Sequence, residues 1–600
     1  MVQEFEFEFF KNNASLFFAL SATNLASNLN ASANIIVNTY GMTPLNYTFN
    51  LCDVLQGQLC PLPQYNVTGS LSLPLPSGIE LPIPEIAFQI PDLEAVAQVT
   101  LRRVETGEAA VCLQATLSNG WSLHIQAVAI ATGTIALISL LSSIFQSFYY
   151  PQSSTAVFRT ITTFSFFQQI ALSGMLHLNF PSAYTAFVTN FAWSFGLFSR
   201  SDIIQSAIER MRAGTGSNLS EEPQAPTAYS DRTLSPYNLA AGSHDKSFDI
   251  GTFIGGTDTQ PYTPDHSFIT PAVVTTSSQT LDPGIPVYVN YVNVATGNAF
   301  MSMFFTLLFL FIAFGFLHLA VFGGLKWASN HKKGGADKKL EKFRSVLASN
   351  SIRLVQICLL PGILLSLFQW TLHDSWLSTF ISVIIFLGIM SALGYPTFLI
   401  IREALANGHQ NFNEDTMQKS PQGALIAPYK YTKYYFFLVA LFAPVIRAAF
   451  VSLARSNGFV QVVGLVTLEV LYMIILLCIR PFHNRRGDVF EVTIAFIRLI
   501  STGALLPFVK EKLDVDAIPR VAIGIGVAIV LSVGVVLISL NVIAHALPWR
   551  WAWRTIRGIK KDKKGAEESL DTDSELEKGP TCVPSSAKEE DSAPTPVAKD

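Results

Sequence analysis

Long apolar stretches that are nearly free of charge recur along this chain of 600 residues, and they constrain its fold more than any other feature. The clearest lie at 121–145, 299–325, 352–372, 375–401, 432–454, 458–479, 489–509 and 518–547, and a further one lies within 158–211. Roughly 20 apolar residues of helix cross a hydrocarbon core about 30 Å thick. Inside a lipid bilayer, only helices and closed β-barrels give every backbone N–H and C=O group a hydrogen-bond partner. The sequence therefore predicts a polytopic α-helical membrane protein with about nine transmembrane helices.

Charged residues are scarce, as this class of protein requires. They make up 14% of the chain, and hydrophobic residues make up 50%, whereas an average soluble domain is about 25% charged. The sequence holds no phosphate-binding loop, dinucleotide fingerprint, zinc-ligand spacing or nucleophile elbow. We therefore expect no enzyme, no metal site, no bound cofactor and no nucleic-acid partner. The remaining function classes are transport across a membrane, sensing at it and scaffolding.

Positive charge gathers in two segments and predicts on which side each loop lies. Residues 326–344 hold seven basic and two acidic residues, net +5, and residues 549–564 hold seven and one, net +6. Lys and Arg are enriched in cytoplasmic loops close to spans, so both segments are expected in the cytosol. The loop 213–298 holds two basic and eight acidic residues, net −6. It falls on the lumenal or extracellular side.

The number of spans before residue 213 decides the topology. If the N-terminal region and the acidic loop share one side, an even number of spans separates them. We place the second span at 158–180 and interpret 182–211 as an amphipathic or re-entrant segment. The alternative makes 182–203 a tenth span, which would put both chain ends on the same side. The resulting domain boundaries are 1–120, 121–212, 213–298, 299–548 and 549–600.

The first 120 residues have the pattern of an all-β domain. Phe5, Phe7 and Phe9 alternate with glutamates, which is typical of a half-buried strand. Further strand candidates lie at 35–37, 86–88, 96–104 and 111–117, and turn-rich stretches lie at 41–44 and 73–78. Short strands separated by such turns predict an antiparallel, immunoglobulin-like sandwich.

Three cysteines in this region, Cys52, Cys60 and Cys112, are disulfide candidates if the domain is exported. Their odd number and the strand pattern directly after Met1 lead us to expect a signal segment and a fourth cysteine further upstream. The alternative is that the stretch 121–145 inserts as a signal anchor.

Modification motifs follow the same topology. Asn-x-Ser/Thr sequons, which are candidate glycosylation sites, occur on the predicted lumenal side at Asn13, Asn30, Asn46, Asn66 and Asn218. In the tail, Thr572 and Ser574 have acidic residues three positions downstream and are candidate phosphorylation sites. The basic start of the tail carries Trp549, Trp551 and Trp553. It can attract anionic lipid, or it can simply reflect the cytosolic side.

Ionisable residues inside the predicted spans are the candidates for function, because they are costly in lipid. Glu469 and Arg498 lie midway along their spans, and Arg447 lies deep in a third. Glu491 is seven residues before Arg498 and shares its helix face. One interpretation is a polar transport path or gate. The other is a buried Glu469–Arg498 pair that only locks two helices together.

Several peptides resemble a fungal family known as TRP-like channels or flavin carriers. They are Cys60-Pro61-Leu62-Pro63, Ile83 to Ala95, Cys112 to Gly120, Asn190-Phe191-Ala192-Trp193-Ser194-Phe195-Gly196 and Arg480-Pro481-Phe482. The resemblance covers roughly residues 5–550 in order. It implies a lumenal ML-like, lipid-recognition sandwich followed by a TRP-like membrane domain.

The resemblance implies a function in transport but leaves the substrate open. We expect a calcium-permeable cation channel involved in ion homeostasis and cell-wall maintenance. The alternatives are a carrier of FAD into the endoplasmic reticulum lumen, with FAD as a transported substrate, and a lipid-sensing scaffold. Membrane lipids, a lipid ligand of the ML-like domain and calcium or other cations are the expected partners. The expected location is a membrane of the secretory pathway, the vacuole or the cell surface. The sequence does not decide whether the protein forms a homo-oligomer.

Overall fold

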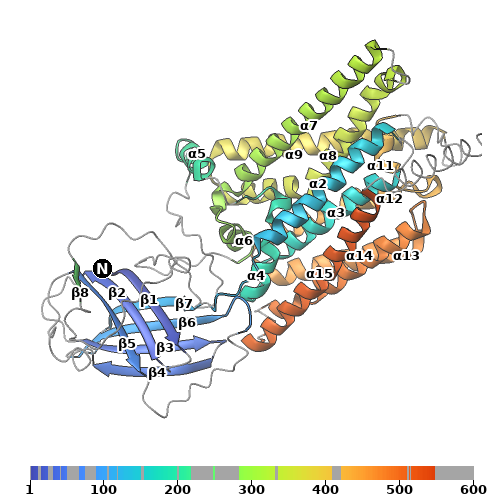
Figure 1. Ribbon diagram of the computed structural model, residues 1–600. Coiled ribbons are helices and arrows are strands. Elements are labelled where there is room, and N and C mark those ends of the chain that lie inside the picture. Colours follow the sequence, from blue (N-terminus) through green and yellow to red (C-terminus); the bar gives the residue numbers. More distant parts are fainter. Residues whose placement is uncertain are drawn as a thin grey trace, which may run out of the picture. The chain divides into compact units, whose positions relative to one another are not determined.

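The protein combines an N-terminal β-domain with a helical bundle (Figure 1). The computed structural model describes residues 2–10, 15–23, 31–40, 42–50, 66–74, 89–104, 107, 109–117, 119–149, 154–198, 202–217, 247–249, 283–331, 336–407, 420–509, 512–513 and 515–546. The predicted strand at 86–88 and the tail 549–600 lie outside these ranges.

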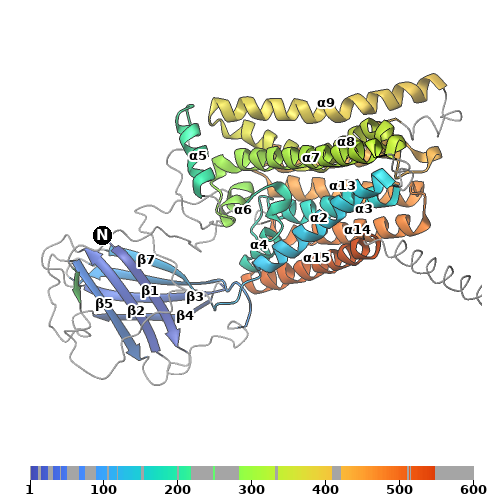
Figure 2. The same ribbon diagram turned by 45° about the horizontal axis from the view of Figure 1, so that its top comes forward.

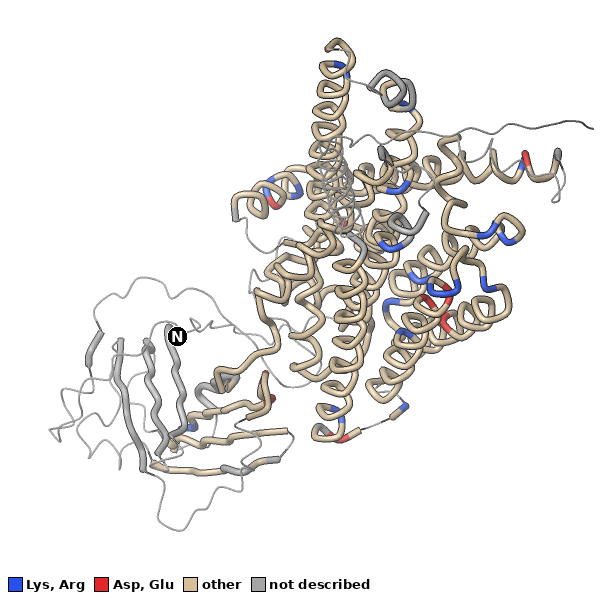
Figure 3. The backbone as a smooth tube through the Cα atoms, turned by 45° about the vertical axis from the view of Figure 1, so that its right-hand side comes forward, with Lys and Arg blue, Asp and Glu red and all other residues tan. Residues whose placement is uncertain are grey.

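Eight helices in the described part of the chain are long and apolar enough to cross a membrane. They are α2 (Gln126–Tyr149), α7 (Ala299–Asn330), α8 (Ala336–Leu372), α9 (Trp376–Asn407), α12 (Phe436–Leu453), α13 (Gly458–Ile479), α14 (Arg485–Gly503) and α15 (Ala517–Ala546). Each matches a predicted span, so the polytopic helical class is confirmed. Long stretches of these helices carry no charged residue (Figure 3).

A further helix, α3 (Ser154–Ser173), packs against α2 inside the bundle. Its 20 residues extend about 30 Å, enough to cross the hydrocarbon core. Polar side chains such as Gln168 and Gln169 make it less apolar than the other eight, but both are buried against protein rather than lipid. With α3 included, nine described helices are long enough to cross a membrane, and eight of them are also apolar enough.

The predicted second span 158–180 is too long. Helix α3 ends at Ser173, and at Gly174 a Cβ would meet the side chain of Tyr288 at 2.9 Å. The chain then forms α4 (Ser182–Thr189), the 3-10 turn η2 (Ala192–Phe195) and α5 (Asp202–Ala213).

The alternative tenth span at 182–203 is wrong, because α4 has eight residues and extends only about 12 Å. The expected amphipathic character holds for α5, where Ile208 is buried and Ile203 is exposed. It fails for α4, which is buried on every side except at Ser182.

Helix packing is close where small residues allow it. Figure 2 shows α9 along the outer side of α7 and α8, beside the remaining helices. Helix α15 packs against α2, α3 and α4, and its Gly524 and Gly534 lie against Pro181 and Phe166. Small residues let helix backbones approach in a membrane, where close packing replaces the hydrophobic effect as a driving force.

The acidic segment 213–298 ends in structure that the sequence did not predict. Helix α6 (Ile285–Tyr291) and the 3-10 turn η3 (Thr296–Asn298) lead into α7. The side chains of Tyr288 and Asn298 are fully buried. The last part of this segment is therefore part of the bundle rather than a surface loop.

The β-domain consists of two four-stranded sheets. One has the order β1 (Val2–Phe10), β2 (Ser15–Thr23), β5 (Asn66–Pro74), β8 (Ser247–Asp249), and the other has the order β4 (Met42–Asn50), β3 (Ala31–Thr39), β6 (Ala95–Arg103), β7 (Ala109–Leu117). All pairings except β5–β8 are antiparallel.

The predicted all-β domain is thus confirmed, and its strands at the start of the chain and at 35–37, 96–104 and 111–117 lie in β1, β3, β6 and β7. The strands β2, β4 and β5 were missed. The turn-rich stretches 41–44 and 73–78 overlap strands, because β4 begins at Met42 and β5 continues to Pro74. Both strands do contain a period-2 pattern, at Leu45, Tyr47 and Phe49 of β4 and at Val67, Leu71 and Leu73 of β5, but the adjoining proline and glycine residues are typical of turns.

The close contacts of α15 predict how two nearby glycines differ. A Cβ at Gly524 would collide with Pro181, whereas a Cβ at Gly526 meets nothing within 4 Å. We expect Gly524→Ala to destabilise the bundle by about 1–3 kcal/mol through overpacking. The matched variant Gly526→Ala should leave stability unchanged or slightly raised. Thermal unfolding followed by size-exclusion chromatography in detergent measures both, and equal midpoints would contradict the packing of α15 on α4.

Candidate functional site

Four charged residues from three helices meet inside the bundle. Arg447 comes from α12, Glu469 from α13, and Glu491 and Arg498 from α14. None is more than 4% exposed. The structure therefore brings together all four residues that the sequence singled out, and we call them the ion cluster.

Glu469 is the centre of the ion cluster because both of its carboxylate oxygens accept hydrogen bonds. Arg447 donates to Oε1 from Nε at 3.0 Å and from Nη2 at 2.7 Å. Arg498 donates from Nε to Oε2 at 3.2 Å. The expected Glu469–Arg498 pair is present, but the shorter contact is to Arg447. The spacing of residues within one helix shows only which of them share a face of that helix, so it cannot reveal that Arg447 of α12 pairs with Glu469 of α13.

Glu491 forms the second acidic position of the ion cluster. Its Oε1 lies 3.9 Å from Nη1 of Arg498 and accepts a hydrogen bond from the Tyr472 hydroxyl at 3.2 Å. Its Oε2 accepts one from the Thr162 hydroxyl of α3 at 3.3 Å. The Arg498 guanidinium also lies over the Tyr472 ring, 5.0 Å from its centroid. Two arginines and two glutamates give the ion cluster no net formal charge.

The ion cluster acts as a bridge between helices and not as an ion-binding ring in this state. A carboxylate that coordinates a cation needs free oxygen lone pairs, and both oxygens of Glu469 already face guanidinium groups. Nη2 of Arg498 is buried without a partner. Arg498 therefore lies between two carboxylates with one donor unused.

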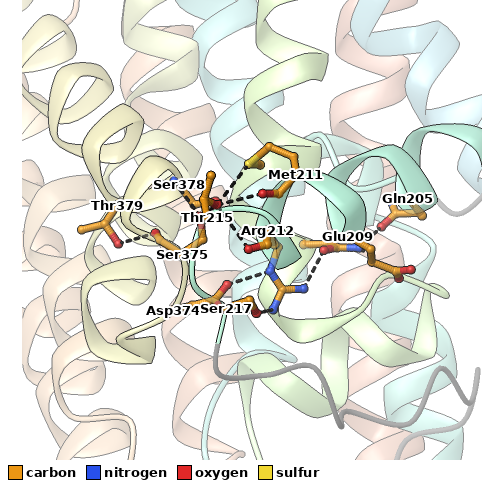
Figure 4. A network of polar contacts seen from close by, with 11 residues as sticks. Gln205, Glu209, Met211, Arg212, Thr215, Ser217, Asp374, Ser375, Ser378 and Thr379 are labelled. Carbon is orange, nitrogen blue, oxygen red and sulfur yellow. Dashed lines mark hydrogen bonds and ion pairs between the residues drawn. The ribbon is translucent and has the colours of Figure 1, made fainter.

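A second polar network, missed by sequence reasoning, joins α5 to the turn between α8 and α9 (Figure 4). Nε of Arg212 donates to Oδ2 of Asp374 at 2.7 Å, and Nη1 donates to Oδ1 of Asn298 at 2.8 Å. Ser217 donates to Oδ1 of Asp374 at 2.6 Å. Thr215 adds a short hydrogen bond to Ser375. The network ties the segment after α4 to the starts of α7 and α9.

The environment of Asp374 favours its ionised form. Burial alone would raise its pKa, but the hydrogen bonds from Arg212 and Ser217 and the charge of Arg212 outweigh burial and lower the pKa below its usual value. A lowered pKa contributes stability above the pKa of the unfolded chain, about 3.9. That contribution is lost only as the pH falls through the lower folded value.

A third charged contact links β6 to the bundle. Glu94, which lies directly before β6 and is 3% exposed, accepts a hydrogen bond from Nη2 of Arg520 at 3.2 Å and from the Ser182 backbone at 2.8 Å. Nothing in the sequence marks this glutamate, because acidic residues are ordinary in loops between strands.

The remaining sequence candidates are only partly placed. Gln168 of α3 donates to the Ile357 carbonyl of α8 at 2.8 Å, which is a hydrogen bond between two helices. Asn46 is exposed on β4. Outside the described residues or side chains lie Cys52, Cys60, Cys112, Asn13, Asn30, Asn66, Asn218, Thr572 and Ser574. In the described part of the chain, no group of His, Cys, Asp and Glu could hold a metal ion.

The Arg212–Asp374 pair predicts a large loss of stability on mutation. Arg212→Ala leaves a buried carboxylate without its partner, which costs about 3–5 kcal/mol. The control Arg210→Ala removes an exposed arginine of the same helix, whose side chain donates a hydrogen bond to the Ser206 carbonyl of α5, and it should be neutral. The contribution of this pair to the thermal midpoint of the wild type should be the same at pH 7 and at pH 5.

A drop in the midpoint from pH 7 to pH 5 that occurs in the wild type but not in Arg212→Ala would contradict the lowered pKa.

Comparison with known proteins accounts for nearly the whole chain. Residues 127–561 match the transient receptor potential (TRP) ion channel family, and residues 1–123 match the ML-like domain. The chain is similar to the TRP-like ion channel protein flc1 of Cryptococcus neoformans, with 32% identity over 541 residues, which are 87% of this chain and 70% of that protein.

Two further relatives are more distant. Flavin carrier protein 2 of Saccharomyces cerevisiae is 26% identical, covering 84% of this chain and 65% of its own length. The TRP-like ion channel pkd2 of Schizosaccharomyces pombe is 23% identical, covering 90% and 74%. No solved structure matches the chain. The chain is an integral membrane protein that belongs to the transient receptor potential (TRP) ion channel family and carries an N-terminal ML-like domain.

Proposed function

We propose that this protein is a cation channel in which the ion cluster acts as a lock between helices. The observation that carries the proposal is that the two oxygens of Glu469 hold arginines from two different helices, α12 and α14. A movement of any one of α12, α13 and α14 against the others must break or exchange an ion pair. Such a movement therefore has two preferred arrangements rather than a continuum.

Arg498 is the residue that can exchange. It donates to Glu469 of α13 at 3.2 Å and lies 3.9 Å from Glu491 of its own helix, so a movement of α14 away from α13 would leave Glu491 as its nearest carboxylate. The carboxylate that Arg498 leaves keeps its charge. An acidic group that faces a polar path attracts cations, so exchange would couple helix movement to permeation.

The relatives named as TRP-like ion channels support a channel, and calcium is the permeant cation that we propose for it. A carrier of FAD is the second candidate function, since three relatives are named as flavin carriers or putative flavin carriers. We also propose a lumenal or extracellular N-terminal domain and a cytosolic C-terminus in a membrane of the secretory pathway. The segregation of basic residues supports this orientation.

From the ion cluster we predict that each single substitution lowers the yield of folded protein more than the paired substitution does. Glu469→Gln leaves Arg447 and Arg498 with one carboxylate, and Arg498→Gln leaves two carboxylates with one arginine. Stranding a buried charge costs about 3–5 kcal/mol, so each single variant should lower the yield of folded protein. The double variant Glu469→Gln/Arg498→Gln should recover much of it. The control Arg455→Gln, exposed just after α12, should match the wild type. Simply additive losses would show that the residues do not interact.

Flux through proteoliposomes separates the two candidate functions. A channel should pass calcium without saturation at low micromolar concentrations, whereas a carrier should pass FAD with saturation. If the ion cluster is a lock, Arg498→Gln should raise calcium flux per folded molecule, because it removes one of the two arginines that hold Glu469. Arg498→Lys should lie between that variant and the wild type. Saturable FAD uptake without calcium flux would reject the channel, and unchanged calcium flux in Arg498→Gln would reject the lock.

A further inference from the structure

Four buried polar atoms in α8 and α9 have no hydrogen-bond partner among the described residues. They are both amide atoms of Gln369, the hydroxyl oxygen of Ser366 and the hydroxyl oxygen of Ser378. All three residues are 0% exposed. A buried polar group without a partner costs stability, and folded proteins contain few of them. The position of these atoms therefore needs a physical reason.

Serines elsewhere in the spanning helices avoid this cost. Ser391 of α9 and Ser532 and Ser539 of α15 each donate to a carbonyl of their own helix three or four residues earlier. The hydroxyls of Ser366 and Ser378 make no such bond. The difference therefore lies in the surroundings of these two side chains rather than in the residue type.

The unpartnered atoms of α8 lie on the face that packs against α9. Gly362, Ser366 and Gln369 share one face of α8, because residues four and seven apart lie on the same side of a helix. A Cβ at Gly362 would collide with the side chain of Ile389 of α9. This face of α8 is therefore turned towards α9.

The matching face of α9 begins at Ser378. Ser378, Ser382 and Ile389 are spaced by four and seven residues and so share one face of α9. Ser382 accepts a hydrogen bond from Nε1 of Trp370 of α8 at 2.8 Å, which places Ser382 beside the residue that follows Gln369. We call Ser366, Gln369, Ser378 and Ser382 the polar seam.

The polar seam covers only the half of the interface that is next to the turn between α8 and α9. Beyond it, Ile389 closes on Gly362, and the buried apolar residues of α9 farther from the turn are Leu393, Ile400 and Ala404. An apolar constriction excludes water and ions until it widens, and channels use such constrictions as gates. A polar approach that ends at an apolar constriction is thus the arrangement expected of a closed path.

Helix α9 is attached to the bundle mainly through α8. It packs extensively against α8 and only slightly against α7, and it lies along the outer side of both (Figure 2). Pro396 lies inside α9, and proline is the usual cause of a bend in a long helix. Helix α9 can therefore separate from α8 without breaking contacts to most of the bundle.

The ion cluster has a direct route to the polar seam. Helix α12, which carries Arg447, packs against α8, and Ser452 of α12 donates to the Leu364 carbonyl of α8 at 2.8 Å. Leu364 lies two residues before Ser366. A displacement of α12 therefore reaches the helix that carries half of the polar seam.

We propose that the polar seam lines the cation path, and that this path opens when α9 separates from α8. The proposal rests on the proposed function as a channel. In the open arrangement the hydroxyl and amide groups face water and cations instead of one another. Their neutral oxygens are hard ligands that can replace part of the water shell of a cation, and none of the four residues carries a charge that would hold the ion in place.

Replacing the amide of Gln369 separates this role from a structural one. Gln369→Met removes both unpartnered atoms at nearly the same volume, so its thermal midpoint in detergent should equal or exceed that of the wild type. Calcium flux per folded molecule should fall about tenfold, because the path loses one polar ligand. The control Ser391→Ala, on the exposed face of α9, should match the wild type in both measurements.

Two results of this experiment would overturn the proposal. A lower midpoint for Gln369→Met would show that the amide already has a partner in the closed bundle. Unchanged calcium flux in a folded Gln369→Met would show that cations do not pass the amide.

Thiol labelling in proteoliposomes measures whether water reaches the polar seam. Ser378→Cys keeps the size of the side chain and should react with a charged methanethiosulfonate that does not cross the membrane, and the attached charge should lower calcium flux. Ser391→Cys, on the exposed face of the same helix, should react no more than the wild type, whose own cysteines set the background. Equal labelling of the two variants would refute an aqueous path between α8 and α9.

The labelling also distinguishes failure of the polar seam from failure of the channel. Calcium flux through the wild type without labelling of Ser378→Cys would reject the polar seam and leave the channel standing. Labelling of Ser378→Cys without calcium flux through the wild type would reject the channel but support the polar seam as an aqueous path.

Discussion

The carboxylate of Glu469 is the interaction on which the middle of the bundle depends. A charge inside a membrane is tolerated only when it is paired and hydrogen-bonded, and Glu469 satisfies this with two arginines at once. The three helices α12, α13 and α14 must therefore keep their positions along their axes relative to one another for these hydrogen bonds to persist. A two-residue pair would fix two helices, whereas this arrangement also positions Glu491, Tyr472 and, through Thr162, the buried helix α3.

The same requirement explains why the region after α3 folds as it does. Helix α4 is too short to cross a membrane, yet it is buried, so its ends need partners supplied by protein rather than by water. Ser182 at its start is bonded to Glu94, and Arg212 further on is bonded to Asp374 and Asn298. The segment from α4 to α5 is thus bonded to Glu94 of the β-domain at one end and to the starts of α7 and α9 at the other. A movement of the ML-like domain would reach α15 and α4 through Glu94 and Arg520.

Whether the sequence could reveal each of these charged residues depends on where the residue lies relative to the apolar stretches. Glu469 and Arg498 interrupt apolar runs, so their positions alone mark them as costly and in need of partners. Arg212 and Asp374 stand next to runs, where charge is ordinary, and they lie 162 positions apart. Arg353 looked like a flanking residue at the start of the stretch 352–372. It is interior only because α8 begins at Ala336, a boundary that apolarity does not reveal since charged residues extend the helix. The strands β4 and β5 were missed although their apolar residues alternate, because the prolines and glycines beside them are typical of turns, and β2 was missed because its apolar run from Leu16 to Leu20 shows no alternation.

Pairing also separates two uses of arginine in this bundle. Where a carboxylate faces the guanidinium, both charges are neutralised within the protein, and the arginine has a structural or switching role that needs no ligand. Where only hydroxyl and amide groups face it, as at Arg353, the hydrogen bonds are partly satisfied but the charge is not. Within the described residues, the charge of Arg353 is therefore met only by the dipoles of hydroxyl and amide groups, which distinguishes it from the four arginines that face a carboxylate.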